Sequence, residues 1–520
     1  MARRELQVLA LVIASAALLG LPFLRYVGWL GDEGTWLHGA SRLLRGEPLY
    51  AGFFRLFPGV YFIVAGWMKV FGSSLLSIRV LALASITGVT GAAYLGGRLS
   101  SGSRVVSAIC ALTFALTGHG PWTTISHHWF SALFGTAAVT MALSASASPR
   151  PRPLMLAAVL AGAAAMMTPP VGAIGFAATA TAALHVPRGN RLGAAAAIVL
   201  GALLVPAASL LAIRMSGVTV IGASADATSK ITRFGGMQGI PFGAGSDAHN
   251  VVLVYAFPFV FLATLALAIR SRGALVRDPP CQVALVAALG AFVTCWPRPD
   301  VVHISFRAAM ALPLFALVVT RGIAAMREAA STRWRTLRLG AGLVTCALLL
   351  AWTTRGYIEI VRVARASPVI ATSKGPVAFG PGTAPEELGS LIATIAQTPD
   401  GAGFFFYPYE PMLPYLLSRR QVTLIDIFTP GHTTSAQYDE SCRSLMTQAE
   451  FVVIDTTWTD PEMWKEAFPA LEDPRPPETR AFEAALERAF VEQATFGRYR
   501  LLRRAAASPD LCAAIGRGAG

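Results

Sequence analysis

Acidic residues are scarce in the first two thirds of this chain. Residues 1–356 hold only 9 of the 29 Asp and Glu residues, against 28 Lys and Arg. Of all 520 residues, 14% are charged and 54% are hydrophobic, and the mean hydropathy is +0.54. Soluble domains carry about 25% charged residues. The shortage of charge excludes an ordinary soluble enzyme and predicts a membrane protein with many spans.

The chain also lacks the marks of nucleotide- and nucleic-acid-binding proteins. It contains no GxGxxG, Walker or nucleophile-elbow motif. Its net charge of +14 comes from the membrane part, since residues 357–520 carry 15 basic and 20 acidic residues. Basic loops set the orientation of a membrane protein. The positive charge therefore predicts a lipid bilayer as partner and no nucleic acid.

Long apolar runs predict about 11 transmembrane helices, because about 20 apolar residues cross a bilayer. They lie near residues 7–27, 76–96, 104–119, 128–145, 154–167, 170–186, 192–213, 250–269, 281–296, 304–320 and 339–356. The two runs around Thr168-Pro169-Pro170 are short, so they predict either two helices or one long kinked helix. The first run continues past Ala14-Ser15-Ala16, which favours an uncleaved helix over a signal peptide.

Basic residues alternate between the ends of these spans in a regular way. They precede the first span and follow the second, fourth, sixth, eighth and tenth, for example at Arg98, Arg150, Arg188, Arg270 and Arg321. All of these loops fall on one side, which the positive-inside rule makes cytoplasmic. The count then places residues 357–520 outside. Polar and acidic residues collect in the loops of that outer side.

The most informative of these outer residues are Asp32 and Glu33, which directly follow the first span. A carboxylate beside the bilayer is costly, so it marks a functional site or a paired charge. The alternative is that the pair only ends a helix in the headgroup region. Residues 33–49 then predict an amphipathic surface helix. Residues 58–71 predict a second apolar helix, too short to span comfortably.

This order of features resembles the GT-C integral-membrane glycosyltransferases, especially the protein O-mannosyltransferase and lipid A aminoarabinose transferase type. The resembling features are the acidic pair, the amphipathic helix, a Pro-led apolar helix that ends at Phe71-Gly72, and a span that opens with Ile78-Arg79. The resemblance covers residues 1–190 by motif and the rest by topology. It implies a polyprenyl-phosphate sugar as donor.

The family resemblance also implies roles for particular residues. Asp32 matches the general base for the acceptor, and Glu33 matches the acidic residue that follows it. Arg55, three residues before Pro58, is the nearest match to the basic residue that holds the lipid phosphate. Many members carry an acidic residue in the second outer loop, where this sequence has Ser126-His127-His128.

Other outer residues suit the same chemistry. A departing lipid phosphate needs cations, and further candidates are Arg298, Arg233 and Lys230. Asp300 and His303 lie close to Arg298 in the sequence; the three either form a self-paired helix cap or orient a phosphate or sugar.

A metal site is the other possibility at this face. His127 or His128 either binds a divalent metal with Asp32 or Glu33, or is an interfacial histidine beside Trp129. The sequence predicts no cofactor with certainty.

Residues 357–520 predict a small extracytoplasmic α/β domain. Residues 403–408 and 451–455 predict buried strands, and residues 384–396 and 479–494 predict helices. Candidate sugar contacts are Tyr407, Tyr409, Glu410 and Asp426. Cys442 and Cys512 can pair only in an oxidising compartment, which the sequence leaves open. The domain either binds the acceptor or covers the mouth of the site.

Together these features predict an α-helical polytopic GT-C-like protein of the bacterial cytoplasmic membrane. Residues 1–356 would form the catalytic membrane domain and residues 357–520 the outer domain. The expected activity is sugar transfer from a polyprenyl-phosphate donor to a glycan, lipid or protein acceptor of the cell envelope. The alternatives are a transporter or flippase for lipid-linked glycans and a non-catalytic scaffold. A transporter needs charges near mid-span, and the span interiors lack them, which favours the enzyme.

Overall fold

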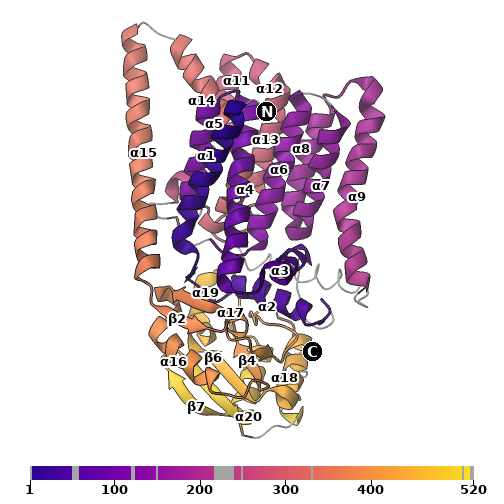
Figure 1. Cartoon of the computed structure of the whole chain (residues 1–520), viewed down its shortest axis with the longest axis vertical. Helices are drawn as coiled ribbons and strands as arrows, with labels where there is room; N and C mark the ends of the chain where they lie inside the picture. Colours follow the sequence, from indigo (N-terminus) through magenta and orange to yellow (C-terminus); the bar gives the residue numbers. More distant parts are fainter. Residues whose placement is uncertain are drawn as a thin grey trace.

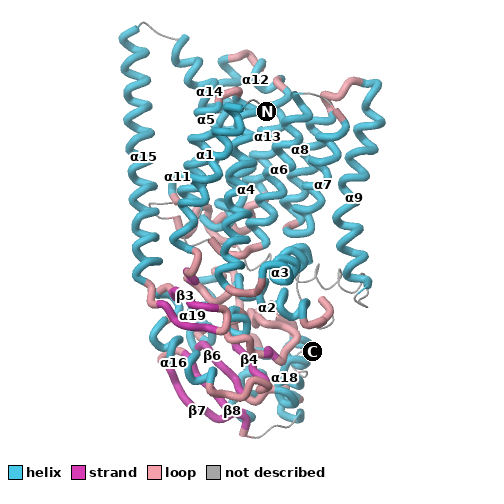
Figure 2. Tube along the Cα trace, in the orientation of Figure 1, coloured by secondary structure: helices cyan, strands magenta, loops and turns pink. Residues whose placement is uncertain are grey.

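The structure consists of a bundle of long helices, an α/β domain at one end of the bundle, and two short helices between them (Figure 1, Figure 2). It is a computed structural model that describes residues 3–49, 58–118, 123–147, 150–215, 239–246, 250–328, 332–431, 433–505 and 509–515. The predicted fold class, a polytopic helical protein with a C-terminal α/β domain, is confirmed.

The bundle helices run side by side along the long axis of the molecule (Figure 1). They are α1 (Arg3–Gly20), α4 (Leu75–Ser101), α5 (Arg104–Gly118), α6 (His127–Ala147), α7 (Pro151–Met167), α8 (Pro169–Ala183), α9 (Arg191–Met215), α11 (Val251–Arg270), α13 (Pro279–Val293), α14 (Val301–Glu328) and α15 (Thr332–Ala366). The short α12 (Ala274–Arg277) connects α11 and α13.

Every predicted span overlaps one of these helices, although the first, near residues 7–27, extends past the end of α1 at Gly20. Seven helices in the described ranges are long and apolar enough to cross a membrane, namely α1, α4, α6, α9, α11, α14 and α15. The remaining α5, α7, α8 and α13 are shorter, at 15–17 residues. The number of membrane crossings stays a prediction.

The structure decides between the two interpretations of the Thr168 region. α7 ends at Met167 and α8 begins at Pro169, where proline is tolerated because the first helical N–H needs no partner. A Cβ on Gly172 would lie 2.4 Å from the Cβ of Ala165. The two helices therefore fold back on each other as a hairpin with closely packed backbones, and they do not form one kinked helix.

α14 is the central helix and α15 a peripheral one. In the apolar window of α14, 83% of the residues are buried, against 11% in α15 and 17% in α9. Exposed leucines such as Leu203, Leu204 and Leu348 cover α9 and α15. In a bilayer such side chains face lipid, so the core of the bundle forms around α4, α6 and α14.

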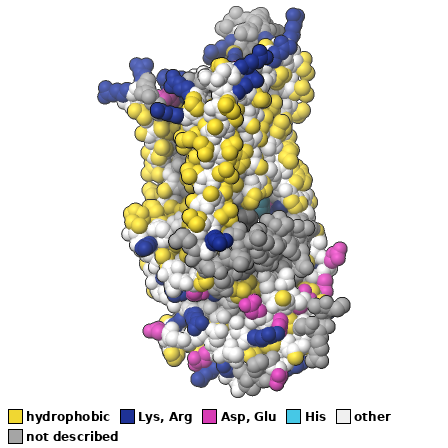
Figure 3. All heavy atoms as spheres, turned by 90° about the vertical axis from the view of Figure 1, so that its right-hand side faces the viewer, with side chains coloured by type: hydrophobic (Ala, Val, Ile, Leu, Met, Phe, Trp, Pro, Cys, Tyr) yellow, Lys and Arg dark blue, Asp and Glu magenta, His cyan; other side chains and the backbone are white. Residues whose placement is uncertain are grey.

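Charged side chains separate along the axis of the molecule. Figure 3 shows a band of hydrophobic side chains on the visible face of the bundle, with Lys and Arg gathered at the end away from the C-terminal domain. The acidic side chains in this view lie mainly on the C-terminal domain. This separation agrees with the sidedness that the basic loops predict.

The two predicted surface helices are present at the junction between bundle and domain. α2 (Asp32–Leu44) and α3 (Pro58–Phe71) lie there (Figure 1). α2 is shorter than the predicted stretch of residues 33–49.

The C-terminal domain contains a five-stranded sheet in the order β5-β4-β6-β8-β7. Its strands are β4 (Gly403–Tyr407), β5 (Arg420–Gln421), β6 (Phe451–Asp455), β7 (Phe490–Phe496) and β8 (Tyr499–Arg504). The helices around it are α16 (Pro385–Ala396), α17 (Met412–Leu416), α18 (Ser435–Gln448), α19 (Pro461–Ala467) and α20 (Pro477–Ala489). The strands predicted at 403–408 and 451–455 are confirmed. The helix predicted over 479–494 ends at Ala489, because the next residues pair with β8.

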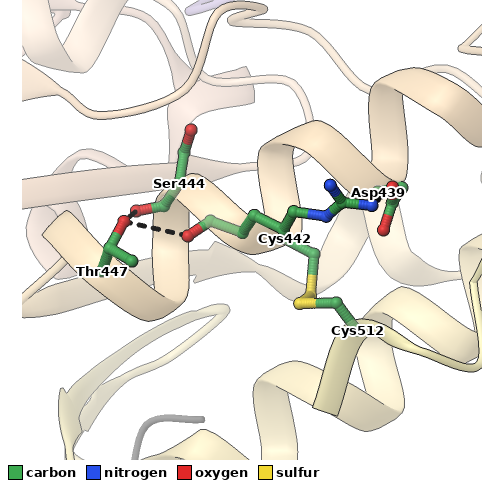
Figure 4. Close-up of a disulfide and its surroundings, with 6 residues drawn as sticks. Asp439, Cys442, Ser444, Thr447 and Cys512 are labelled. Carbon is green, nitrogen blue, oxygen red and sulfur yellow. Dashed lines mark hydrogen bonds and ion pairs between the residues drawn. A yellow bond between two sulfur atoms is a disulfide. The ribbon is translucent and has the colours of Figure 1, made fainter. Parts of the chain in front are cut away.

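A second sheet ties the domain to the first outer loop. β1 (Tyr26–Val27) pairs in parallel with β3 (Gly375–Phe379), which pairs with β2 (Val369–Thr372). α15 continues to Ala366, past the predicted domain boundary at residue 356. Cys442 of α18 forms a disulfide with Cys512, so the structure chooses the paired state (Figure 4).

Candidate functional site

The two adjacent acids Asp32 and Glu33 face different surroundings. They open the first turn of α2, where neighbouring side chains diverge by about 100°. Asp32 is exposed, whereas only 5% of Glu33 is accessible to solvent. Sequence spacing does not distinguish the two acids, but the orientation of α2 gives them different exposure.

Glycines on both sides of the acidic pair allow the C-terminal domain to approach α2. A Cβ on Gly31 would lie 2.4 Å from Cε1 of Tyr409, and one on Gly34 would lie 2.0 Å from the backbone nitrogen of Met412. That nitrogen donates a hydrogen bond to the carbonyl of Leu30 at 3.0 Å. A larger residue at Gly34 would displace α17 from the start of α2.

Glu33 is held by a buried ion pair. Arg79, near the start of α4, donates to Oε1 of Glu33 and, at 2.8 Å, to the carbonyl of Tyr26. The backbone nitrogen of Ile125 also donates to Glu33 Oε1 at 2.8 Å. Glu33 thus connects α2, α4 and the segment before α6, which is a positioning arrangement.

Asp32 receives its contact from the C-terminal domain. The hydroxyl of Tyr409 donates a hydrogen bond to Oδ1 of Asp32. Burial raises the pKa of Tyr409 well above its ordinary value, and the Asp32 carboxylate adds to the shift. Tyr409 therefore stays protonated at neutral pH and remains a donor that fixes the exposed carboxylate.

Aromatic rings surround this contact. The Tyr409 ring centroid lies 5.9 Å from Trp29, 5.1 Å from Trp458 and 6.1 Å from Trp464. The Trp29 and Trp458 rings are nearly parallel at 6.3 Å, and Trp29 is 44% exposed. Asp32 is thus exposed beside an aromatic surface to which bundle and domain both contribute.

The predicted group Arg298, Asp300 and His303 is self-paired. Arg298 Nε donates to Asp300 Oδ2 at 2.8 Å, and Nδ1 of His303 lies 2.7 Å from Oδ1. Burial acts to raise the pKa of Asp300, but hydrogen bonds and charge from His303, together with the bond from Arg298, lower it below its ordinary value. Asp300 therefore stays ionised and balances Arg298.

Arg298 nevertheless belongs to the same region as Asp32. Its guanidinium carbon lies 5.2 Å from the ring centroid of Phe468, which stacks on Trp464 at 6.0 Å. Trp464 in turn contacts Tyr409. The aromatic cluster therefore links the loop before α14 to the exposed acid on α2.

The two adjacent histidines lie between α2 and α14. His127 packs on Trp36 with centroids 4.9 Å apart, and His128 stacks on Phe306 at 4.7 Å. His128 also lies 5.1 Å from His303.

The described residues provide no ligand set for the metal considered at this position. Within the described ranges, no group of three or more His, Cys, Asp or Glu residues is arranged to hold a metal ion. The predicted carboxylate partners are engaged elsewhere, Asp32 with Tyr409 and Glu33 with Arg79.

Three predicted phosphate ligands, Arg55, Lys230 and Arg233, lie outside the described residues. Two arginines inside the bundle were given no site role from the sequence: Arg79 was used only as the start of a span, and Arg307 was not singled out. Arg79 of α4 and Arg307 of α14 are buried, at 0% and 4% exposure. Their signal was visible as single arginines near the outer ends of apolar runs.

The other candidate sugar contacts, Tyr407, Glu410 and Asp426, are buried. Oδ2 of Asp426 lies 3.0 Å from Nδ1 of His38. Arg42 donates to its Oδ1 at 3.2 Å, so Asp426 connects α2 to the C-terminal domain. Burial raises the pKa of Glu410 well above its ordinary value, next to Asp455. Tyr407 donates to Glu483 at 3.1 Å.

A polar cavity of about 490 Å³ lies at the far end of α2. It is lined by Arg42, Arg45 and Glu47 and by residues 420–424 of the C-terminal domain, with three residues of α18. This cavity is separate from Asp32, which lies at the opposite end of the helix.

Comparison with known proteins gives matches in structure only. No protein-family model matches the chain, and no curated protein matches its sequence. Among solved structures, ArnT from Cupriavidus metallidurans bound to undecaprenyl phosphate aligns over 97% of this chain and 99% of its own, with a TM-score of 0.50 and 12% identity. The apo state of ArnT aligns over 96% and 98%, with a TM-score of 0.49 and 14% identity. Arabinosyltransferase EmbB from Mycobacterium smegmatis aligns over 60% of this chain and 30% of its own, with a TM-score of 0.44 and 19% identity.

The alignment with undecaprenyl-phosphate-bound ArnT includes both the helical bundle and the C-terminal domain, since it covers nearly all of either chain. At this identity it establishes a shared fold. The chain therefore has the GT-C fold of integral-membrane proteins.

Proposed function

We propose that this protein is a membrane glycosyltransferase that moves a sugar from a polyprenyl-phosphate donor to an acceptor at the outer face of the bacterial cytoplasmic membrane. The acceptor is a glycan, a lipid or a protein of the cell envelope. The observation that carries the proposal is the exposed carboxylate of Asp32, fixed by Tyr409 at the junction of bundle and domain. A donor anchored in the bilayer and an acceptor outside it meet at such a junction.

Asp32 acts as the general base in this proposal. It accepts the proton of the acceptor hydroxyl or amine while the acceptor oxygen or nitrogen bonds to the anomeric carbon of the sugar. The bond from that carbon to the phosphate oxygen breaks, and its electron pair leaves with the lipid phosphate. The Tyr409 hydroxyl keeps one carboxylate oxygen in place, so that the other is directed to the acceptor.

Three further observations support the proposal. The shared fold is that of ArnT, which was solved with undecaprenyl phosphate bound. The Cys442–Cys512 disulfide favours an oxidising compartment for the C-terminal domain. Basic side chains gather at the opposite end of the bundle (Figure 3), as expected for the cytoplasmic side.

The test is the transfer reaction of the purified chain with a panel of undecaprenyl-phosphate hexoses and pentoses. We expect Asp32→Asn to lower turnover by about 10²–10⁴-fold, the usual contribution of a general base. Asp400→Asn is the matched control, because Asp400 is a fully exposed carboxylate of the C-terminal domain. Both variants should elute and melt like the wild type. Near-normal turnover of Asp32→Asn, or no sugar consumed by the wild type from any donor, would reject the proposal.

A further inference from the structure

Arg307 is a buried cation whose charge is not balanced by the described structure. It lies near the start of the central helix α14 and is 4% exposed. Its Nε and Nη1 atoms are buried and have no hydrogen-bond partner within the described ranges. An uncompensated charge in a low-dielectric interior is costly, so buried arginines are normally paired.

Arg79 shows how this fold treats another arginine at the same end of the bundle. It is 0% exposed, and it forms an ion pair with Glu33 and donates to the carbonyl of Tyr26. Arg307 has no comparable carboxylate among the described residues. The nearby Asp300 is engaged by Arg298 and His303. Within the described ranges, a carboxylate neutralises the Arg79 guanidinium, whereas the Arg307 guanidinium has no such partner.

The surroundings of Arg307 favour an anion. His128 stacks on Phe306, the sequence neighbour of Arg307, and its buried Nδ1 has no hydrogen-bond partner within the described ranges. The His127 ring lies against it, with ring centroids 3.8 Å apart. α6, of 21 residues, begins at His127, and α14, of 28 residues, begins at Val301. Ser126 accepts from the backbone nitrogen of His128 and Asp300 accepts from that of His303, so both helix starts are already capped and the guanidinium is left as the group that attracts an anion.

We propose that Arg307, together with the imidazoles of His127 and His128, binds a phosphate group carried by a membrane lipid. The assignment of that phosphate to a polyprenyl phosphate rests on the proposed function. The geometry agrees with such a donor, because His127 packs on Trp36 and Trp36 lies one turn after Asp32 in α2. Arg298, the cation expected from sequence, is already balanced by Asp300.

The experiment measures lipid binding without any sugar transfer. The full-length protein in phosphate-free maltoside detergent is titrated with undecaprenyl phosphate, undecaprenol, phosphatidylglycerol and inorganic phosphate, and the melting temperature is followed. The variants are Arg307→Met, Arg307→Lys and the control Arg321→Met, which changes an exposed arginine at the other end of α14.

We expect undecaprenyl phosphate, and not undecaprenol, to stabilise the wild type. Arg307→Met should bind it about 10- to 100-fold more weakly, as expected for the loss of a charge-assisted hydrogen bond. Arg307→Lys should fall between the two, because it keeps the charge and loses the planar fork. Without lipid, Arg307→Met should melt no lower than the wild type, since it removes a buried charge that has no carboxylate partner among the described residues.

Two results would overturn the inference. One is unchanged affinity of Arg307→Met for every phosphate probe, and the other is a large fall in its melting temperature without lipid, which would reveal a structural carboxylate partner. Equal stabilisation by phosphatidylglycerol or inorganic phosphate, lost in Arg307→Met, would support the phosphate site and assign it to that source. Because no turnover is measured, the result stands apart from the test of Asp32.

Discussion

The buried pair of Glu33 and Arg79 offers the sharpest test of the site's architecture. The Glu33 side chain is 4% exposed and that of Arg79 is 0% exposed. Glu33→Met would leave the guanidinium without its carboxylate and the backbone nitrogen of Ile125 without its acceptor. Removal of one partner from a buried ion pair costs about 3–5 kcal/mol. We expect a loss of that size in the free energy of unfolding, and a similar loss for Arg79→Met.

The double variant separates the pair from other effects. Replacing both residues by Met removes both charges, so its cost should be smaller than the sum of the single costs by about 1–3 kcal/mol. The assay is reversible unfolding of the purified protein in mixed micelles with increasing dodecyl sulfate. The control is the pair Arg355 and Glu359 on α15, whose side chains are 83% and 56% exposed. Exposed pairs of this spacing contribute only about 0.3–0.5 kcal/mol.

The outcome bears on the roles of the two acids. If the losses in unfolding free energy of the two single variants add up to that of the double variant to within about 0.5 kcal/mol, Arg79 does not hold Glu33. The predicted catalytic role of Glu33 is then favoured again. A strong coupling, together with stable but inactive Asp32→Asn protein, would assign positioning to Glu33 and proton transfer to Asp32.

Two further predictions concern the contact of α2 with the C-terminal domain and the disulfide of that domain. Burial lowers the pKa of His38; the charges of Arg42 and Arg45 act in the same direction, and Asp426 opposes them. The unfolded chain therefore binds a proton more readily than the folded chain. The free energy of unfolding should fall as the pH drops below about 6.5, the ordinary pKa of histidine. His38→Gln should flatten this dependence, measured by unfolding between about pH 7.5 and pH 5.5, and an unchanged slope would contradict it. The Cys442–Cys512 disulfide joins residues 70 positions apart, a closure worth about 4 kcal/mol. Dithiothreitol should therefore lower the melting temperature of the wild type but not that of a Cys442→Ser, Cys512→Ser variant, and an equal response of both would refute the bond.

Much of the architecture follows from local properties of the chain. Each predicted span overlaps a helix because the length and apolarity of a run determine whether it suits a bilayer. The gathering of basic residues at one end of the bundle follows from the positions of the arginines along the sequence. The surface helices, the strands at 403–408 and 451–455 and the place of the acidic pair were visible for the same reason.

The tertiary structure alone decided which groups meet. Asp32 and Tyr409 are 377 positions apart, and no periodicity brings them together. The choice between Asp32 and Glu33 depends on which side of α2 packs against α4. Arg298 and Arg307 look alike as isolated arginines, yet one has a carboxylate beside it and the other has none within the described ranges. Burial and charge balance arise from contacts between distant segments, and these contacts exist only once the bundle and the C-terminal domain have packed together.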